Sequence, residues 1–187
     1  MEPIVVRPFR PDDVDDLRAT YLELYEERDS GDPVGIPLFT VRPSPEDEAT
    51  WFERQHQRMR DGDLVWMVAE VGGRAVGNCT VGRMGPAKTA EDAHLGELGL
   101  LVDRAMRGRG VGSALLERSL AEARTMFDVV FLTVFTHNTR ARALYERFGF
   151  TVCGHLPRAM KRGDRYFDAE RMVRVFADSS PTGGANR

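Results

Sequence analysis

The sequence predicts an α/β fold with a mixed, largely antiparallel sheet of about seven strands and helices on both faces. Apolar runs of strand length alternate along the chain with stretches of helical periodicity. Gly72-Gly73 joins two strand-like runs as an antiparallel hairpin turn would, and the glycine-rich segment 107–113 stands between a strand-like run and a helix. The length of 187 residues suits one domain, which we expect to span residues 1–176, with a disordered tail at 177–187.

The N-terminal segment predicts a strand and then a helix. Residues 4–7 form a short β run, and Asp12 and Asp13 follow at the position of a helix N-cap. Apolar residues then recur at helical spacing, at Val14, Leu17, Tyr21 and Leu24. The chain is therefore expected to begin with a strand and a helix in succession.

A second helix is predicted after an irregular segment. Residues 29–43 contain two glycines and three prolines, which interrupt regular structure. Ser44 and Pro45 then provide an N-cap and a proline at the first helical position, and two acidic residues follow in the first turn. We expect this helix to end at about Met59.

The centre of the chain predicts an antiparallel meander followed by a strand, a loop and a helix. Strand-like runs at 64–71 and 74–81 flank the two-glycine turn, and the polar loop 82–93 leads to a further strand at 95–102. The helix after the glycine-rich segment starts at about Ala114. Its apolar stripe consists of Leu116, Leu120, Ala123 and Phe127.

The C-terminal part predicts a second strand and helix and then a closing hairpin. Residues 129–135 form a continuous apolar run, typical of a strand that is covered on both faces. Asn138 can cap a helix that ends at Gly149. The strand-like runs 155–160 and 167–176 flank a polar turn, so the core ends in a hairpin.

Composition and charge favour a small-molecule or peptide partner. The net charge is −3, and basic residues are dispersed among acidic ones, so we expect neither nucleic-acid nor membrane binding. No apolar run approaches the 18 residues of a membrane span, and the N-terminus lacks a signal peptide, so we expect a cytoplasmic protein. Cys79 and Cys153 have no paired spacing and are expected to be buried free thiols.

The glycine-rich segment is the strongest functional signal. Its sequence is Arg107-Gly108-Arg109-Gly110-Val111-Gly112-Ser113, directly before a helix. Glycines let the backbone approach a ligand closely, and the helix directs its unpaired N–H groups at an anion, which indicates a phosphate cradle. A tight strand-to-helix turn without a ligand would use the same glycines.

Other phosphate sites and other chemistries fit less well. A P-loop needs Lys followed by Ser or Thr after its last glycine, and a dinucleotide site needs G-x-G-x-x-G, whereas glycines alternate here. The four histidines have no metal-ligand spacing, and no G-x-S-x-G motif is present. Neither metal-dependent nor acyl-enzyme chemistry is indicated.

Two long motifs make the chain similar to one family. The run LGLLVDRAMRGRGVG at 98–112 resembles the fourth strand and the Q/R-x-x-G-x-G/A loop of the GNAT superfamily of acetyl-CoA-dependent N-acetyltransferases. The run NTRARALYERFGF at 138–150 resembles that family's second cofactor motif, N-x-x-A-x-x-L-Y-x-x-x-G-F. The resemblance covers nearly the whole chain except residues 20–60 and the tail.

The resemblance implies a GNAT fold in which the fourth and fifth strands splay apart around the pantetheine arm of acetyl-CoA. The pyrophosphate would rest on main-chain N–H groups of the glycine-rich segment, with two arginines adding charge. Asn138 corresponds to a cofactor-contacting asparagine and can also be a helix cap. The predicted cofactor-binding residues are Leu100, Val102, Arg107, Gly108, Arg109, Gly110, Val111, Gly112, Ser113 and Asn138.

The resemblance also suggests the catalytic residues. Tyr145 matches the tyrosine that in many members protonates the departing CoA thiolate, although it can also simply pack on its helix. Relatives that acetylate a ribosomal protein's N-terminal alanine use a fifth-strand glutamate as general base, and Thr133 stands at that position here. Glu97 is therefore our candidate base, with His94 and His137, which we expect at the same end of the sheet, as weaker alternatives.

The predicted function is an acyltransferase reaction, the direct transfer of acetyl from acetyl-CoA to a primary amine in a ternary complex, without a metal. The acceptor is expected to be a small amine or amino acid; a protein N-terminus or lysine, or a non-catalytic acetyl-CoA sensor, are alternatives. Acidic residues at 26, 27, 29 and 32 could attract a cationic amine or could form a solvated face. Many relatives pair through their last hairpin, so the resemblance also allows a homodimer.

Overall fold

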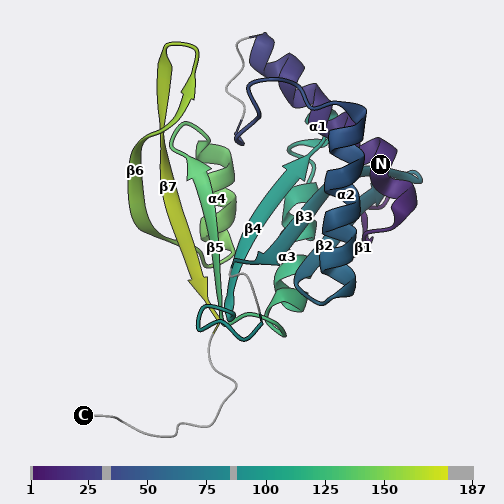
Figure 1. The fold of residues 1–187 in the computed structure, drawn as a ribbon, viewed down its shortest axis with the longest axis vertical. Coiled ribbons are helices and arrows are strands. Elements are labelled where there is room, and N and C mark those ends of the chain that lie inside the picture. Colours follow the sequence, from purple (N-terminus) through teal and green to yellow (C-terminus); the bar gives the residue numbers. More distant parts are fainter. Residues whose placement is uncertain (1, 31–34, 85–87, 177–187) are drawn as a thin grey trace, which may run out of the picture.

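The computed structural model describes residues 2–30, 35–84 and 88–176, and places seven strands of this part in one mixed sheet (Figure 1). The spatial order is β1-β2-β3-β4-β5-β7-β6. Only β4 and β5 pair in parallel. The strands are β1 (Val5–Pro8), β2 (Leu64–Val71), β3 (Arg74–Arg83), β4 (Leu95–Val102), β5 (Val129–Phe135), β6 (Thr151–Arg162) and β7 (Arg165–Val175). The predicted fold class is confirmed; the expected tail, 177–187, lies outside the described residues.

Helices cover both faces of the sheet (Figure 1). The elements α1 (Val14–Asp29) and α2 (Pro45–Arg60) lie on one face, and α3 (Val111–Ala123) and α4 (Thr139–Arg147) on the other. The strand β2 contributes side chains to the hydrophobic core on each face of the sheet, because successive side chains of a strand point to opposite faces. Leu64, Trp66 and Val68 pack in one cluster, and Val65, Met67 and Ala69 pack in the other. None of the described helices is long and apolar enough to cross a membrane.

Both α1 and α2 start where the sequence predicts, but only α2 has the expected side-chain cap. Ser44 Oγ accepts a hydrogen bond from the Asp47 N–H at 3.1 Å and caps α2. Asp13 is the N-cap residue of α1, as predicted, but its side chain makes no capping hydrogen bond to that helix; it is also the last residue of a short 3-10 turn, Pro11–Asp13. Its carboxylate accepts a hydrogen bond from the Arg10 N–H and pairs with Arg7 at 2.6 Å, which ties β1 to α1.

The parallel pair β4–β5 separates along its length, and this opening positions the site. Only Leu95, Gly96 and Glu97 pair with β5, whereas β4 stays paired with β3 as far as Val102. From Leu98 onward, no strand of the described residues pairs with the edge of β4 that faces β5. The two strands form a V that is closed at Glu97 and open toward the glycine-rich segment.

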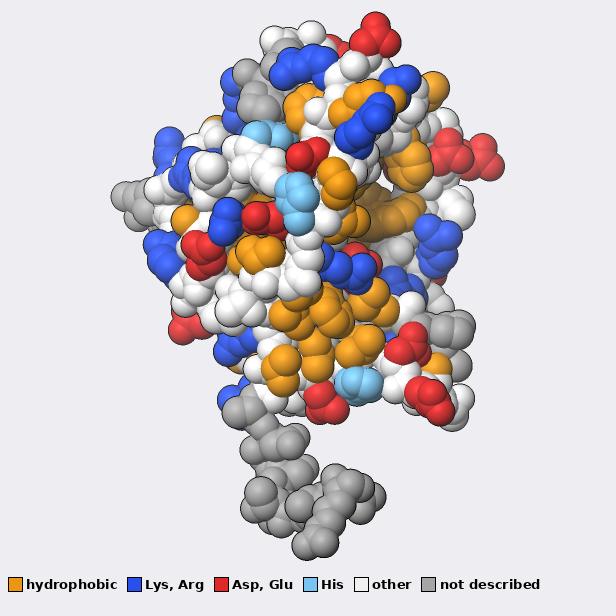
Figure 2. Space-filling view, turned by 90° about the vertical axis from the view of Figure 1, so that its left-hand side faces the viewer, with side chains coloured by type: hydrophobic (Ala, Val, Ile, Leu, Met, Phe, Trp, Pro, Cys, Tyr) orange, Lys and Arg blue, Asp and Glu red, His pale blue; other side chains and the backbone are white. Residues whose placement is uncertain are grey.

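The closing hairpin places β6 at the edge of the sheet, and the space-filling view faces this side of the molecule (Figure 2). Most β6 side chains are exposed, among them Val152 and Leu156. Cys79, in the central strand β3, is buried as predicted. The prediction for Cys153 is wrong, because Cys153 lies on this exposed edge strand.

Candidate active site

The glycine-rich segment forms an open cradle at the N-terminus of α3. Gly108 and Gly110 have φ of +83° and +91°, a region that side chains disfavour, and Gly110 precedes the first helical residue. The first helical hydrogen bond runs from Ala114 N–H to the Gly110 carbonyl. The three preceding helical N–H groups thus have no partner within the helix and can bind an anion. The helix begins three residues earlier than predicted.

Two arginines of α4 flank this cradle. The Arg140 guanidinium lies against Gly108, where any Cβ would collide with Nη2. Arg147 Nη2 donates to Ser113 Oγ at 3.3 Å. Sequence reasoning assigned neither arginine to the cofactor, because their positions follow from the packing of α4 on α3.

Arg107 makes a different set of contacts from those expected of a phosphate-binding residue. Its two Nη atoms donate to the carboxylate of buried Glu27 on α1 at 2.8 and 2.9 Å, and its Nε donates to the Val102 carbonyl at 3.0 Å. This Glu27 was expected in a solvated or amine-attracting acidic group, and instead it neutralises Arg107. Arg109 is exposed, and the Val111 side chain is buried in the core.

Asn138 caps α4 as predicted. Its Oδ1 accepts from the Ala141 N–H at 3.2 Å. The amide nitrogen lies against Gly35, whose segment crosses toward α4. The side chain thus lies where the strand β5 ends and the V is widest.

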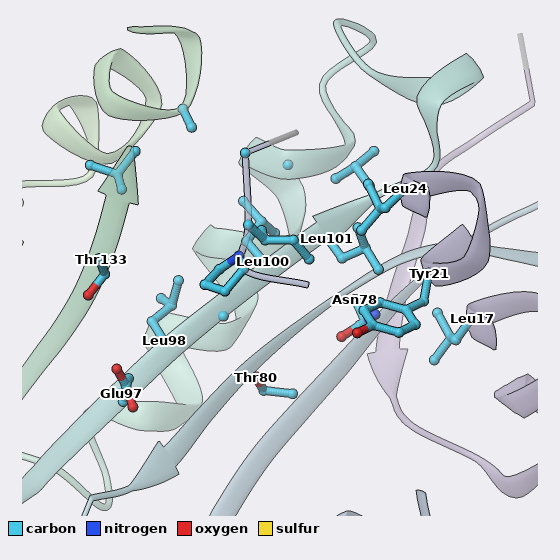
Figure 3. Close-up of a pocket in the computed structure, with 18 of the residues that line it drawn as sticks. Leu17, Tyr21, Leu24, Asn78, Thr80, Glu97, Leu98, Leu100, Leu101 and Thr133 are labelled. Atoms are coloured by element: carbon cyan, nitrogen blue, oxygen red, sulfur yellow. The ribbon is translucent and has the colours of Figure 1, made fainter. Parts of the chain in front are cut away.

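One cavity of about 1980 Å³ joins most of the predicted site residues. It runs from the cradle along the V to Glu97 and then beneath α1 and α2. Figure 3 shows Glu97, Leu98 and Leu100 on β4, Thr133 across the opening on β5, and Thr80 and Asn78 on β3. Its lining includes Leu100, Val102, Arg107, Gly108, Gly110, Gly112, Ser113, Asn138, Tyr145 and Glu97, but neither Arg109 nor Val111.

Tyr145 lies on the α3 and α4 face of the sheet. It is 7% exposed, packs edge-on against Phe150 and lines the cavity. Burial raises the pKa of its phenol above the ordinary value, and the neighbouring Cys79 thiol adds to the shift. The phenol therefore keeps its proton throughout the neutral range.

Glu97 lies on the opposite face. It is the last β4 residue paired with β5, and the neighbouring Leu98 points into the core with Tyr145. Its carboxylate is exposed to the cavity, and Thr133 places a hydroxyl across the V. An acid on one face and a base on the other can reach a thioester in the V from opposite sides.

The two histidines do not share one end of the sheet, contrary to expectation. His94 precedes β4 at the closed end of the V and does not line the cavity, whereas His137 follows β5 at the open end and lines it. Because β4 and β5 run in the same direction, a residue that precedes β4 and a residue that follows β5 lie at opposite ends of the strand pair. Across the described ranges, no three His, Cys, Asp or Glu side chains gather as ligands of a metal ion would.

Comparison with known proteins gives a consistent result. A model of the acetyltransferase (GNAT) family matches residues 19–150. An L-amino acid N-acetyltransferase of Escherichia coli is 31% identical over 71% of this chain and 79% of its own length.

Solved structures share the fold over nearly the whole chain. A ribosomal-protein-alanine N-acetyltransferase from Brucella melitensis superposes with a TM-score of 0.78 at 26% identity, over 92% of this chain and 99% of that one. A phosphinothricin acetyltransferase from Sinorhizobium meliloti, solved with acetyl-CoA, has a TM-score of 0.76 at 20% identity, over 97% and 93% of the two chains.

Proposed function

The chain belongs to the acetyltransferase (GNAT) family, and on that premise we propose that it transfers acetyl from acetyl-CoA to the primary amine of a small molecule such as an amino acid. The observation that carries this proposal is the single cavity that joins the anion cradle, Tyr145 and Glu97. A relative named for L-amino acids supports the choice of acceptor.

The cradle and the V fit the parts of acetyl-CoA. The free N–H groups at the start of α3, with Arg140 beside Gly108, would hold the pyrophosphate. The unpaired edge of β4 at Leu100 and Val102 would pair with the pantetheine amides as an added strand does. Arg107 would act mainly by fixing the loop, because Glu27 already neutralises its charge. Arg109 would contribute at most long-range charge.

Glu97 would activate the acceptor. An alkyl ammonium group has a pKa near 10.4 and an α-amino group near 8, so the amine must lose a proton before it attacks. Glu97 would take that proton, directly or through a water molecule, and direct the amine toward the thioester carbonyl from the α1 and α2 face. Thr133 cannot serve as the base, since its hydroxyl does not accept a proton at neutral pH.

Tyr145 would complete the transfer. As the new C–N bond forms and the C–S bond breaks, the departing sulfur needs a proton, and the Tyr145 phenol offers one from the opposite face. Its raised pKa ensures that the proton is present. Positioning of both reactants in one cavity supplies the rest of the catalysis.

The test is CoA release from acetyl-CoA, detected by thiol reagent, across amino acids, polyamines, aminoglycosides and short peptides. Turnover with small amines or amino acids supports the proposal, and turnover with peptides alone supports a protein acetyltransferase instead. Binding of acetyl-CoA without turnover on any amine would support a sensor, for which Thr133 in place of a carboxylate is the motivating observation. Glu97→Gln should lose turnover with little change in acetyl-CoA affinity.

A further inference from the structure

The cavity lining contains more basic than acidic side chains, and three of its arginines, Arg18, Arg83 and Arg107, are paired with carboxylates. Eight arginines and three acidic residues line the cavity, although the whole chain has 26 basic and 29 acidic residues. The phosphates of acetyl-CoA account for the arginines beside the cradle. They do not account for Arg42, Arg54 and Arg58, which line the cavity from α2 and the segment before it.

Arg58 is the best fixed of these three side chains. Its Nη1 donates to Oε1 of buried Gln55 at 3.1 Å, and its Nη2 donates to the Arg83 carbonyl at 3.0 Å. Both acceptors are uncharged, and no described acidic residue forms an ion pair with Arg58. A guanidinium carries five N–H donors, so this half-buried group keeps three donors and its full charge for a ligand.

The strand beneath Arg58 is shaped to admit it. Gly82 lies under the guanidinium, and a Cβ there would stand 2.9 Å from Nη2. Gly82 pairs directly with Glu97, so the two residues share one face of the sheet. Cross-strand neighbours have Cβ atoms about 5 Å apart, which places the Arg58 guanidinium within about 8 Å of the Glu97 Cβ.

A fixed cation and a candidate base thus stand side by side over neighbouring strands. An amine at Glu97 would place a substituent two or three bonds away within reach of Arg58. We propose, on the basis of the proposed function, that the acceptor is an amine bearing an oxyanion, foremost the carboxylate of an α-amino acid, and that Arg58 is the residue that selects it.

The experiment compares amino acids with their primary amides, which keep the amine and the side chain but lose the negative charge. Several side chains are used, and kcat/KM is expressed per free amine, because the amide lowers the pKa of its neighbouring amine. The wild type should prefer the acid by about 10- to 100-fold, the effect of a hydrogen-bonded charged group. Aminophosphinates and aminophosphonates, added as a third arm, separate a carboxylate site from a phosphoryl site.

Variants assign the preference to Arg58. Arg58→Gln should reduce the acid-to-amide ratio to near one, chiefly through KM for the acid, and Arg58→Lys should restore part of it. Arg60→Gln is the matched control, because Arg60 lies on the same helix and contacts Glu53, His56 and Gln57, none of which lines the cavity. Acetyl-CoA affinity and the thermal midpoint check that Arg58→Gln still folds.

The outcomes separate the two proposals. Equal turnover of acids and amides by the wild type would overturn this inference and leave the proposed function intact. The same holds if Arg58→Gln keeps the wild-type preference for the acid. Absence of turnover on every amine would overturn both. A wild-type preference for the acid that is lost in Arg58→Gln and kept in Arg60→Gln supports the inference. Binding of amino acid and amide to the enzyme–CoA complex by calorimetry gives a readout without turnover.

Discussion

At the residue scale, Tyr145 combines burial with access to the cavity, and its phenol is the group that we propose as the proton donor to the departing sulfur. Tyr145→Phe removes only the hydroxyl and preserves the packing on Phe150. General acid catalysis contributes about 10²- to 10⁴-fold, so we expect kcat to fall about 10²-fold with acetyl-CoA affinity nearly unchanged. Single-turnover kinetics and acetyl-CoA titration measure the two effects separately.

The matched control is Tyr166→Phe, in the hairpin and outside the cavity lining, which should leave kcat unchanged. Since burial raises the pKa of Tyr145, the wild-type rate should show no loss from its ionisation below about pH 10. A Tyr145→Phe enzyme with wild-type kcat would remove Tyr145 from the mechanism.

The two cysteines should differ sharply in reactivity. Cys153 is exposed on β6, whereas Cys79 is fully buried, and burial raises the pKa of its thiol to about 12. Because the thiolate is the reactive form, we expect one thiol per chain to react with a disulfide reagent in the native protein from pH 7 to 9.5, and two in denaturant. Cys153→Ser should abolish the native reaction. Two thiols reacting natively at equal rates would contradict the buried position of Cys79.

The same shift predicts how Cys79 affects stability. The unfolded thiol has a pKa near 8.5, below the folded value of about 12, so the unfolded state loses its proton first as pH rises. The contribution of the buried Cys79 thiol to the free energy of unfolding is complete below about pH 8.5. It declines as pH rises toward 12, by at most about 1.4 kcal/mol per pH unit. The free energy of unfolding, measured with denaturant, should decline less steeply between pH 8.5 and 10 in Cys79→Ala than in the wild type.

Some single residues of the site could be read from the sequence, and others could not. Tyr145 lies in the motif 138–150, which places it on a helix, and Glu97 lies in the strand-like run 95–102, directly before the motif 98–112. Arg58 contacts Gly82 only because the packing of α2 on the sheet brings it to β3. Arg107 pairs with Glu27, which is 80 residues away in the sequence. Such contacts depend on tertiary packing, for which the local pattern carries no signal.

At the element scale, the ion pair between Arg107 and Glu27 joins α1 to the end of β4 and the glycine loop. Glu27→Gln leaves the half-exposed guanidinium without its anion. We expect a loss of about 1–2 kcal/mol in unfolding free energy, the range for hydrogen bonds to charged groups, and a lower thermal midpoint by about 3–6 °C. Thermal unfolding followed by circular dichroism measures it.

Glu26→Gln is the adjacent control, because Glu26 is exposed on the same helix. An equal midpoint shift in both variants would mean that the Arg107 pair contributes nothing specific.

Capping and turn residues predicted α2, α4 and the β2–β3 hairpin well, since those signals are local. The start of α1 was also predicted, but the role of the Asp13 side chain was not, because Asp13 pairs with Arg7 in a contact between two elements rather than within one.

At the scale of the whole molecule, the V between β4 and β5 decides where chemistry can occur. It sets Tyr145 and Glu97, the proposed acid and base, on opposite faces and leads the cavity from the cradle to Glu97 and Arg58. The order of strands and the parallel pair could be expected from the family resemblance. The basic lining of the cavity could not, because its arginines come from α1, α2, β3, α4 and connecting segments that are distant in sequence.

The edge strand β6 leads to the last prediction, which concerns assembly. Among the described strands, none pairs with its outer edge, and Val152 and Leu156 are 42% and 40% exposed there. The second half of β6 holds a proline and three basic residues, so the exposed apolar side chains lie in its first half, at 151–156. An unpaired edge with exposed apolar side chains favours pairing with another chain, and a stable interface needs about 800 Å² per partner, which this edge and its neighbours can supply. We therefore expect a homodimer through β6, and Leu156→Glu should shift it to monomer by placing like charges at the interface. Light scattering after size exclusion measures the mass; Val5→Glu, on the exposed part of the opposite edge strand β1, should stay dimeric. A wild-type mass of one chain, or a Leu156→Glu dimer, would place the interface elsewhere or remove it.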